Sequence, residues 1–209
     1  GGSIDILVNN AGIFDSKSID DTDPDTWNRF LEVNLTGPYL VTIEALGALR
    51  ESEKGHVINI ASEAAKKGFA GSTAYCASKY GLRGFGDALR EDLRAEGIRV
   101  STVYPGATDT TIFDDVAGDW DRSTMKKPED VAEVVWNAYH GEGDQADLDV
   151  ERDRSPSGST DMAEGRTGFS GAALGTWRGA RSLDNPRLWP AARSQRRSVR
   201  RRTVPTRRP

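Results

Sequence analysis

Short apolar runs alternate with longer amphipathic stretches over roughly the first 150 residues. Three runs, at residues 4–12, 55–62 and 98–106, are continuous enough for buried strands, and each ends in small or polar residues. Strands that alternate with helices are joined by right-handed crossovers. The pattern therefore predicts an α/β fold built on a parallel sheet.

The intervening stretches have the spacing of helices. Residues 24–49, 73–96 and 128–139 each place apolar side chains on one side, and Asp23 followed by Pro24 is a favourable start for the first helix. Residues 146–151 alternate apolar and polar positions, which is typical of a half-buried edge strand.

A candidate chemical pair lies in the second predicted helix. In "STAYCASKYG" Tyr75 precedes Lys79 by four residues, so both side chains lie on one helix face and can contact one ligand. A nearby ammonium group favours the phenolate and lowers the pKa of a tyrosine toward the working range. The alternative is a half-buried tyrosine beside a solvated lysine.

Polar residues follow the predicted strands. Ser62 falls just past the apolar part of the run at 55–62, and Asn9, Asn10, Ala11 and Gly12 end the first run. Ligands of open α/β sheets bind outside the carboxyl ends of the strands, so Ser62 is placed to bind a substrate oxygen. The alternative is that Ser62 only forms a turn or caps a helix.

Together these residues resemble the short-chain dehydrogenase/reductase family. "NNAG" at 9–12 resembles the family motif after its fourth strand, and "LEVNLTG" supplies Asn34 at the position of the catalytic asparagine. Ser62 lies 13 residues before Tyr75, "YCASK" matches the "YxxSK" form, and "PGATDT" at 105–110 resembles "PGxxxT". The resemblance covers about residues 3–140.

The resemblance implies a Rossmann-like doubly wound parallel sheet and an NAD(P)-dependent oxidoreductase that moves a hydride between NAD or NADP and an alcohol or carbonyl substrate. Tyr75 would be the general acid or base, Ser62 would bind the reacting oxygen, and Lys79 would lower the pKa of Tyr75 and hold the cofactor ribose. Asn34 would fix a water that relays protons to Lys79. The implied cofactor-binding residues are Asn10, Ala11, Gly12, Tyr75, Lys79, Pro105, Gly106 and Thr110. Residues 111–127, with Phe113 and Trp120, match the family's substrate lid.

The chain also departs from the family. Its first residues correspond to the fourth family strand, so we expect the first strands and the Gly-rich loop that binds pyrophosphate to be missing. Two other glycine patterns do not replace that loop. "GLRGFG" at 81–86 falls inside the predicted catalytic helix, and "GEGDQA" at 141–146 carries acidic residues that would repel phosphate. A non-catalytic remnant is therefore the alternative to an active enzyme.

Charge divides the chain into two parts. Residues 1–154 carry 16 basic and 29 acidic residues, whereas residues 155–209 carry 12 arginines, no lysine and 3 acidic residues. With only six Leu, Ile, Val or Phe residues in 55, the tail is too poor in apolar residues for a core. We expect residues 1–153 to form the C-terminal part of a Rossmann domain of this family, and residues 154–209 to be an Arg-rich tail that is disordered or translated out of frame. An arginine arm for nucleic acid is the less favoured alternative.

The remaining features exclude other classes. The single cysteine, Cys76, allows no disulfide within the chain, and two histidines, His56 and His140, are too few and too far apart for a metal site. No apolar run has the length of a membrane span and no signal peptide is visible, so we expect a cytoplasmic protein. By resemblance the protein would form a homo-oligomer, a dimer or a tetramer.

Overall fold

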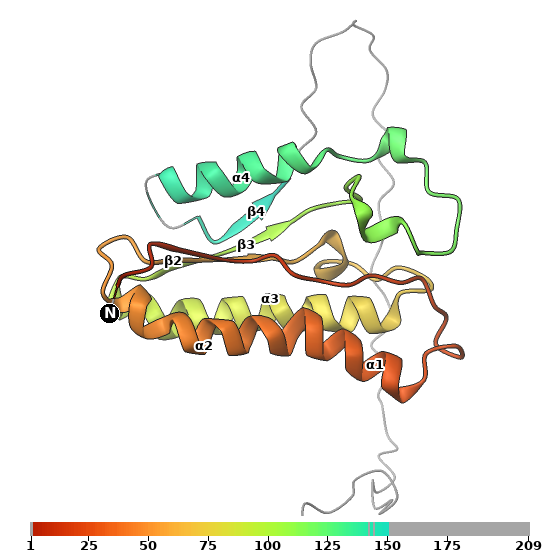
Figure 1. The fold of residues 1–209 in the computed structure, drawn as a ribbon, viewed down its shortest axis with the longest axis horizontal. Helices are drawn as coiled ribbons and strands as arrows, with labels where there is room; N and C mark the ends of the chain where they lie inside the picture. The colour runs from red at the N-terminus through yellow and green to blue at the C-terminus, as the bar shows by residue number, and fades with distance from the viewer. Residues whose placement is uncertain (1, 142, 144, 151–209) are drawn as a thin grey trace, which may run out of the picture. The chain divides into compact units, whose positions relative to one another are not determined.

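Residues 2–141, 143 and 145–150 are described by the computed structural model, and they form a four-stranded parallel sheet between helices (Figure 1). The strands neighbour one another in chain order: β1 (Ile6–Asn9), β2 (His56–Ile60), β3 (Arg99–Tyr104) and β4 (Asp147–Asp149). Each pairs in parallel with the next. The predicted α/β class is confirmed, and the short run at 146–151 forms the edge strand β4.

Helices cover both faces of this sheet. The helices α1 (Pro24–Leu31), α2 (Gly37–Arg50) and α3 (Thr73–Leu93) lie on one face, and α4 (Pro128–His140) lies on the other (Figure 1). Short 3₁₀ turns follow β2 and α3 and interrupt the segment between β3 and α4: Glu63–Ala65, Arg94–Glu96, Thr111–Phe113 and Arg122–Thr124. All three helices predicted from the sequence are present.

The first predicted helix differs from expectation in its middle. It begins as predicted, because the Asp23 carboxylate accepts a hydrogen bond of 2.6 Å from the Thr26 amide and Pro24 is the first helical residue. A π-helical turn, Glu32–Thr36, then separates α1 from α2. π-Turns within helices occur frequently at functional sites, and this one contains Asn34.

The core has a layer on each face, because successive strand residues point to opposite sides of the sheet. One layer, under α2 and α3, consists of Leu49, Val57, Leu93, Ile98 and Val100. The layer under α4 consists of Ile58, Ile60, Val103, Ala138 and Val150. Val57 and Ile58, which are adjacent in β2, thus belong to different layers.

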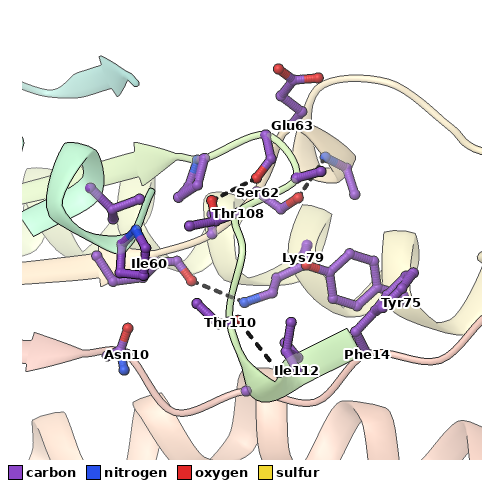
Figure 2. Close-up of a pocket in the computed structure, with 18 of the residues that line it drawn as sticks. Asn10, Phe14, Ile60, Ser62, Glu63, Tyr75, Lys79, Thr108, Thr110 and Ile112 are labelled. Carbon is purple, nitrogen blue, oxygen red and sulfur yellow. Dashed lines mark hydrogen bonds between the residues drawn. The ribbon is translucent and has the colours of Figure 1, made fainter. Parts of the chain in front are cut away.

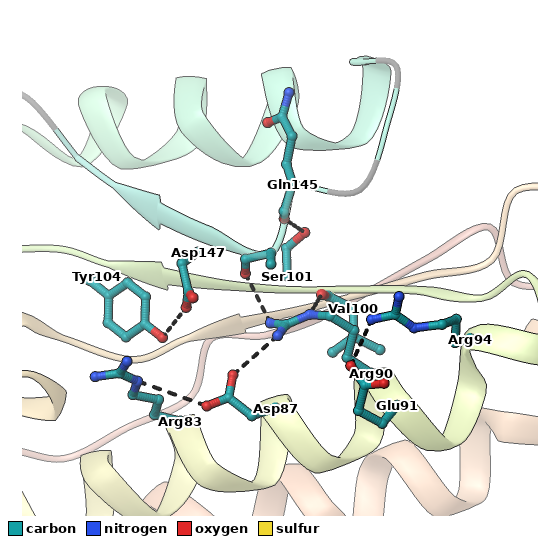
Figure 3. Close-up of polar contacts among 11 residues, drawn as sticks. Arg83, Asp87, Arg90, Glu91, Arg94, Val100, Ser101, Tyr104, Gln145 and Asp147 are labelled. Atoms are coloured by element: carbon teal, nitrogen blue, oxygen red, sulfur yellow. Dashed lines mark hydrogen bonds and ion pairs between the residues drawn. The ribbon is translucent and has the colours of Figure 1, made fainter.

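Polar contacts hold β4 and the turn before it against the sheet and α3 (Figure 3). Arg90 on α3 donates to the carbonyls of Val100, at 2.8 Å, and of Ala146, at 3.1 Å. The Tyr104 hydroxyl donates to Asp147 at 2.5 Å. Burial, reinforced by Asp147, raises the pKa of Tyr104 well above its usual value, so the tyrosine stays neutral.

Two further predictions concern the glycine pattern at 81–86 and the tail at 154–209. The glycine pattern at 81–86 lies inside α3, as expected, so it forms no phosphate-binding loop. The predicted tail at 154–209 lies outside the described residues, and the division at residue 153 stays a prediction. Among the helices that the structure describes, none is long and apolar enough to span a membrane.

Candidate active site

A cleft of about 1040 Å³ opens at the carboxyl ends of β1, β2 and β3 (Figure 2). The parallel register aligns these ends, since Asn9 pairs with Asn59 and Asn59 with Thr102. Eight of the ten predicted site residues line the cleft: Asn10, Gly12, Ser62, Tyr75, Lys79, Pro105, Gly106 and Thr110. Ala11 and Asn34 are not among the lining residues.

Ser62 both caps a turn and faces the cleft. Its hydroxyl accepts a hydrogen bond of 3.1 Å from the Ala64 amide, at the start of the 3₁₀ turn Glu63–Ala65. The same side chain lines the cleft with Tyr75, and its hydroxyl acts to lower the pKa of the phenol. The two readings that the sequence left open are therefore compatible in this structure.

Tyr75 enters the cleft from the first turn of α3, half-buried between aromatic rings. Its ring lies 4.9 Å from that of Phe14 and 6.3 Å from that of Phe30, both edge to face. Burial raises the pKa of Tyr75, and the Ser62 hydroxyl opposes this rise. The phenol is thus the protonated form here.

Lys79 lies one helical turn beyond Tyr75 with a side chain that is almost completely buried. It is 4% exposed, and its ammonium group donates to the Ile60 carbonyl at 2.9 Å. Burial lowers the pKa of Lys79 to about 8. The Nζ atom is 5.9 Å from the centroid of the Tyr75 ring.

This geometry corrects one expectation. The sequence predicted that Lys79 would lower the pKa of Tyr75, but the phenol pKa is raised because burial outweighs every other influence on it. The ammonium group binds Ile60 instead of the phenol oxygen, although both side chains line the cleft. The shared helix face was predicted correctly, and the direction of the pKa shift was wrong for this structure.

Asn34 is fully buried and lies behind the cleft rather than in its wall. Its amide oxygen accepts from the Ile13 amide at 2.8 Å, and its nitrogen donates to the Ile13 carbonyl and to Ser78, each at 3.0 Å. The π-turn therefore connects the loop after β1 to α3, one residue before Lys79. The water expected between Asn34 and Lys79 stays a prediction.

The walls have room and donors for the nicotinamide half of a dinucleotide. A Cβ atom at Gly12 would lie 3.4 Å from the Lys79 ammonium, so only glycine leaves the approach to Lys79 fully open. Within the described residues Lys79 has one acceptor, and an ammonium group has three N–H donors. Thr110 accepts a long hydrogen bond of 3.4 Å from Ile112, and its hydroxyl donates to no acceptor among the residues that the structure describes.

An aromatic wall, formed by Phe14, Phe113 and Trp120, closes the cleft beside Tyr75. The Phe14 ring lies 5.4 Å from Phe113 and 5.7 Å from Trp120, and Phe113 and Trp120 are 5.1 Å apart. The sequence pointed to Phe113 and Trp120 as lid anchors but missed Phe14. The only signal for Phe14 was its place two residues after the "NNAG" motif.

The segment that carries this wall is held at its base. Thr108 and Lys126 form an isolated parallel bridge, in which the Asp109 amide donates to the Lys126 carbonyl at 2.8 Å. Arg122 donates to Asp109 at 2.9 Å, to the Thr110 carbonyl at 3.0 Å and to Asp114 at 2.7 Å. Residues 109–126 therefore form a closed loop over the cleft.

Comparisons with known proteins agree with this architecture. The sequence model of the family described as short chain dehydrogenase matches residues 1–120. Trans-4-hydroxycyclohexanecarboxylate dehydrogenase of Sinomonas cyclohexanicum is 42% identical over 109 residues, which are 52% of this chain and 42% of that protein.

Solved structures share the fold. Serine dehydrogenase from Escherichia coli matches with a TM-score of 0.60 and 30% identity over 70% of this chain and 62% of that one. The 3-ketoacyl-(acyl-carrier-protein) reductase from Brucella melitensis, solved with NADH, matches with a TM-score of 0.64 and 26% identity over 74% and 68%.

The extent of these matches sets what they show. The chain spans about half the length of the curated relatives that it matches, between 42% and 56% for the first four. The family match nevertheless covers more than half of this chain and includes Asn34, Ser62, Tyr75 and Lys79. The chain therefore belongs to the short-chain dehydrogenase/reductase family.

Proposed function

We propose that the protein is an NAD(P)-dependent oxidoreductase that moves a hydride between the cofactor and an alcohol or carbonyl group. The observation that carries the proposal is the meeting of Ser62, Tyr75 and Lys79 at one cleft from two different elements. Two hydroxyl groups and a buried cation there match the needs of a reaction that transfers a proton and a hydride together.

Each side chain has a role that its surroundings support. Ser62 binds the reacting oxygen of the substrate, because its hydroxyl lies at the end of β2 and contacts Tyr75. Tyr75 donates its proton to a carbonyl oxygen, or takes one from an alcohol after losing its own. Lys79 holds the cofactor with the N–H donors that it does not use on Ile60, and Asn34 holds the loop and helix that position Lys79.

The cofactor, NAD or NADP, would accept or supply the hydride. Lys79 and Tyr75 would hold its nicotinamide ribose, and Thr110, Pro105 and Gly106 would contact the nicotinamide ring. Asn10, Ala11 and Gly12 would line its path along the end of β1. Of these, only Ala11 is absent from the cleft wall, so a backbone contact is its proposed role.

A cofactor titration tests the proposal. We expect NADH or NADPH to bind saturably, seen as a change in cofactor fluorescence, and Lys79→Met to weaken that binding about tenfold or more. Tyr75→Phe keeps the ring contacts with Phe14 and Phe30, so it should retain cofactor binding and lose turnover. Absence of binding up to millimolar cofactor would contradict the proposal for this chain and favour the non-catalytic alternative.

We also propose that the partner of this protein is a second copy. The α2 surface exposes a run of apolar side chains, with Tyr39, Leu40, Val41 and Ile43 each 46–54% exposed. Such a patch on a long helix suits a symmetric contact. Leu40→Glu should shift the mass measured by light scattering toward the monomer, while Glu44→Gln on the same helix should not.

The arginine-rich tail carries the other alternative, nucleic-acid binding. It lies outside the described residues. A mobility-shift assay in increasing salt tests this alternative, since phosphate binding by several arginines weakens steeply with salt. We expect no salt-sensitive binding.

A further inference from the structure

We infer that the aromatic wall of the cleft binds an apolar ring, and that the substrate is a ring-bearing secondary alcohol or ketone. This inference rests on the proposed oxidoreductase function and specifies its substrate class. Phe14, Phe113 and Trp120 are then the residues that determine specificity.

The first argument is the position of the wall relative to the reacting hydroxyl. Phe14 comes from the loop after β1 and contacts the Tyr75 ring directly, with centroids 4.9 Å apart (Figure 2). Phe113 and Trp120 come from the loop between β3 and α4 and pack against Phe14. A substrate whose oxygen reaches Tyr75 and Ser62 therefore places its neighbouring carbons against aromatic rings.

The second argument is the charge of the cleft. Three lining residues can carry a charge, Glu63, Lys79 and His140, and each has a partner in the part of the chain that the structure describes. Glu63 pairs with Lys67 at 3.1 Å, Lys79 binds the Ile60 carbonyl, and the His140 ring contacts the Trp136 carbonyl. Lys67 compensates the charge of Glu63, and the proposed function assigns the N–H donors that Lys79 does not use on Ile60 to the cofactor ribose. Apolar contacts therefore dominate the part of the cleft that is left for the substrate.

The third argument is the shape of the wall. The rings meet edge to face or tilted, at interplanar angles of 50–75°. A ligand in the cleft therefore meets several flat ring faces that are steeply inclined to one another. The polar atom of Trp120 is already satisfied, because Nε1 donates to the Val116 carbonyl at 3.2 Å. A flat ring gains edge-to-face contacts there, and it loses less conformational freedom than a flexible chain of equal carbon number.

The mouth of the cleft is also lined by an aromatic residue. Phe69, in the loop between β2 and α3, lines the cleft and is 45% exposed. Lys67 lies over its ring, 5.1 Å from the centroid, and the exposed part of Phe69 adds an aromatic surface to the mouth. Rings larger than one six-membered unit can therefore continue from Phe14 toward Phe69.

The chemistry balances with the proposed site. Oxidation of a secondary alcohol breaks its carbinol C–H and O–H bonds and forms a C=O bond. Oxidised NAD⁺ or NADP⁺ would accept the hydride, and the Tyr75 oxygen, having first lost its own proton, would accept the proton of the alcohol; reduction of the ketone is the reverse. The aromatic wall takes no part in these steps and only orients the carbon that carries the oxygen.

The test compares two ketones with eight carbons, acetophenone and 2-octanone, titrated into the 209-residue protein without cofactor and followed by NMR. We expect acetophenone to bind about three- to tenfold more tightly, although 2-octanone has more CH₂ groups to bury. Phe14→Leu and Trp120→Leu should each remove most of this preference. Phe85→Leu is the matched control, because Phe85 is a partly buried aromatic residue of α3 that does not line the cleft.

Several results would overturn the inference: equal or tighter binding of 2-octanone, no binding of either ketone, or a preference that survives both cleft variants. Loss of the preference in Phe85→Leu as well would show that it does not come from the wall. Because no cofactor is present, the assay is independent of the proposed oxidoreductase function. A ring preference without NADH or NADPH binding would contradict that function and leave the ring site standing.

Discussion

Gly12 lies against Asn34 so closely that a Cβ atom on Gly12 would be 3.3 Å from the Asn34 amide oxygen. The same Cβ would be 3.4 Å from the Lys79 ammonium. Because Gly12 has no side chain, the loop after β1 can pack closely against a buried asparagine and a buried cation. Both polar groups are held by other bonds, since Asn34 binds Ile13 and Lys79 binds Ile60.

Gly12→Ala is expected to disturb this contact. Asn34 must move by a few tenths of an ångström, while the added methyl group fills the space beside Lys79; this overpacks the site and costs about 1–3 kcal/mol of unfolding free energy. Urea unfolding measures this loss, and NADH titration should show weaker binding. Gly47→Ala is the control, because nothing lies within 4 Å of its Cβ and alanine favours the helix by about 1 kcal/mol. Equal stability of the two variants would contradict the argument.

Lys79→Met is expected to raise stability while removing function. Burial lowers the pKa of Lys79 from 10.5 to about 8, so below pH 8 the folded protein keeps a charge that the unfolded chain hydrates better. Between pH 8 and 10.5 the folded protein has released the proton that the unfolded chain still binds. Wild-type stability therefore rises with pH over this range. At pH 7 methionine should gain about 1–3 kcal/mol, reduced by the loss of the bond to Ile60.

Thermal unfolding of Lys79→Met at pH 7 and pH 10 measures this effect. The gain over wild type should shrink at the higher pH, where Lys79 is already neutral when folded. Lys67→Met is the control, since the Lys67 side chain is exposed, unlike that of Lys79. A gain that does not change with pH would show that packing, not charge, explains it.

Much of this site was predictable because its residues follow from chain geometry. The ends of β1, β2 and β3 converge in any parallel sheet, so Gly12, Ser62 and Pro105 could be grouped without a structure. The four-residue spacing likewise placed Tyr75 and Lys79 on one face. Helical and strand periodicities report local structure, and these groupings need nothing else.

Other features depend on contacts that periodicity does not encode. The wall around Phe14 joins two loops about 100 residues apart, and neither loop has a repeating pattern. The π-turn at Asn34 was invisible because the sequence continues as a normal helix through it. The pKa of Tyr75 depends on how deeply the ring is buried, which one sequence cannot give.

His56 is expected to make stability fall in mild acid. It is 1% exposed in β2, its Nε2 contacts the Ser101 hydroxyl at 2.9 Å, and its Nδ1 has no partner in the described structure. Burial, with help from Arg99, lowers its pKa from 6.5 to about 4. Between these values the unfolded chain binds the proton and the folded protein does not, so stability is lost as pH falls from about 6.5 to 4, by about 2–3 kcal/mol.

Urea unfolding at several pH values checks this slope against His56→Gln, which can keep the bond to Ser101 without titrating. The difference between the two curves should grow steadily below pH 6.5. His140→Gln is the matched control, because His140 is exposed at the end of α4, whereas His56 is buried in the sheet. A wild-type curve parallel to that of His56→Gln would show that carboxylates alone cause the acid loss.

Arg122 is expected to govern the order of the loop over the cleft more than the stability of the whole protein. Its ion pairs with Asp109 and Asp114 are partly exposed, so each is worth little in global unfolding. Its third bond, to the Thr110 carbonyl, ties the same guanidinium to the residue proposed to contact nicotinamide. Arg122→Met should leave the unfolding midpoint nearly unchanged and speed chymotrypsin cleavage at Phe113 and Trp120 by about threefold or more.

Arg94→Met, which breaks the exposed pair with Glu91, is the control and should leave that cleavage rate unchanged. If Arg122→Met is cleaved no faster than wild type, the Thr108–Lys126 bridge and the packing of Phe14 against Phe113 and Trp120 hold the loop without it.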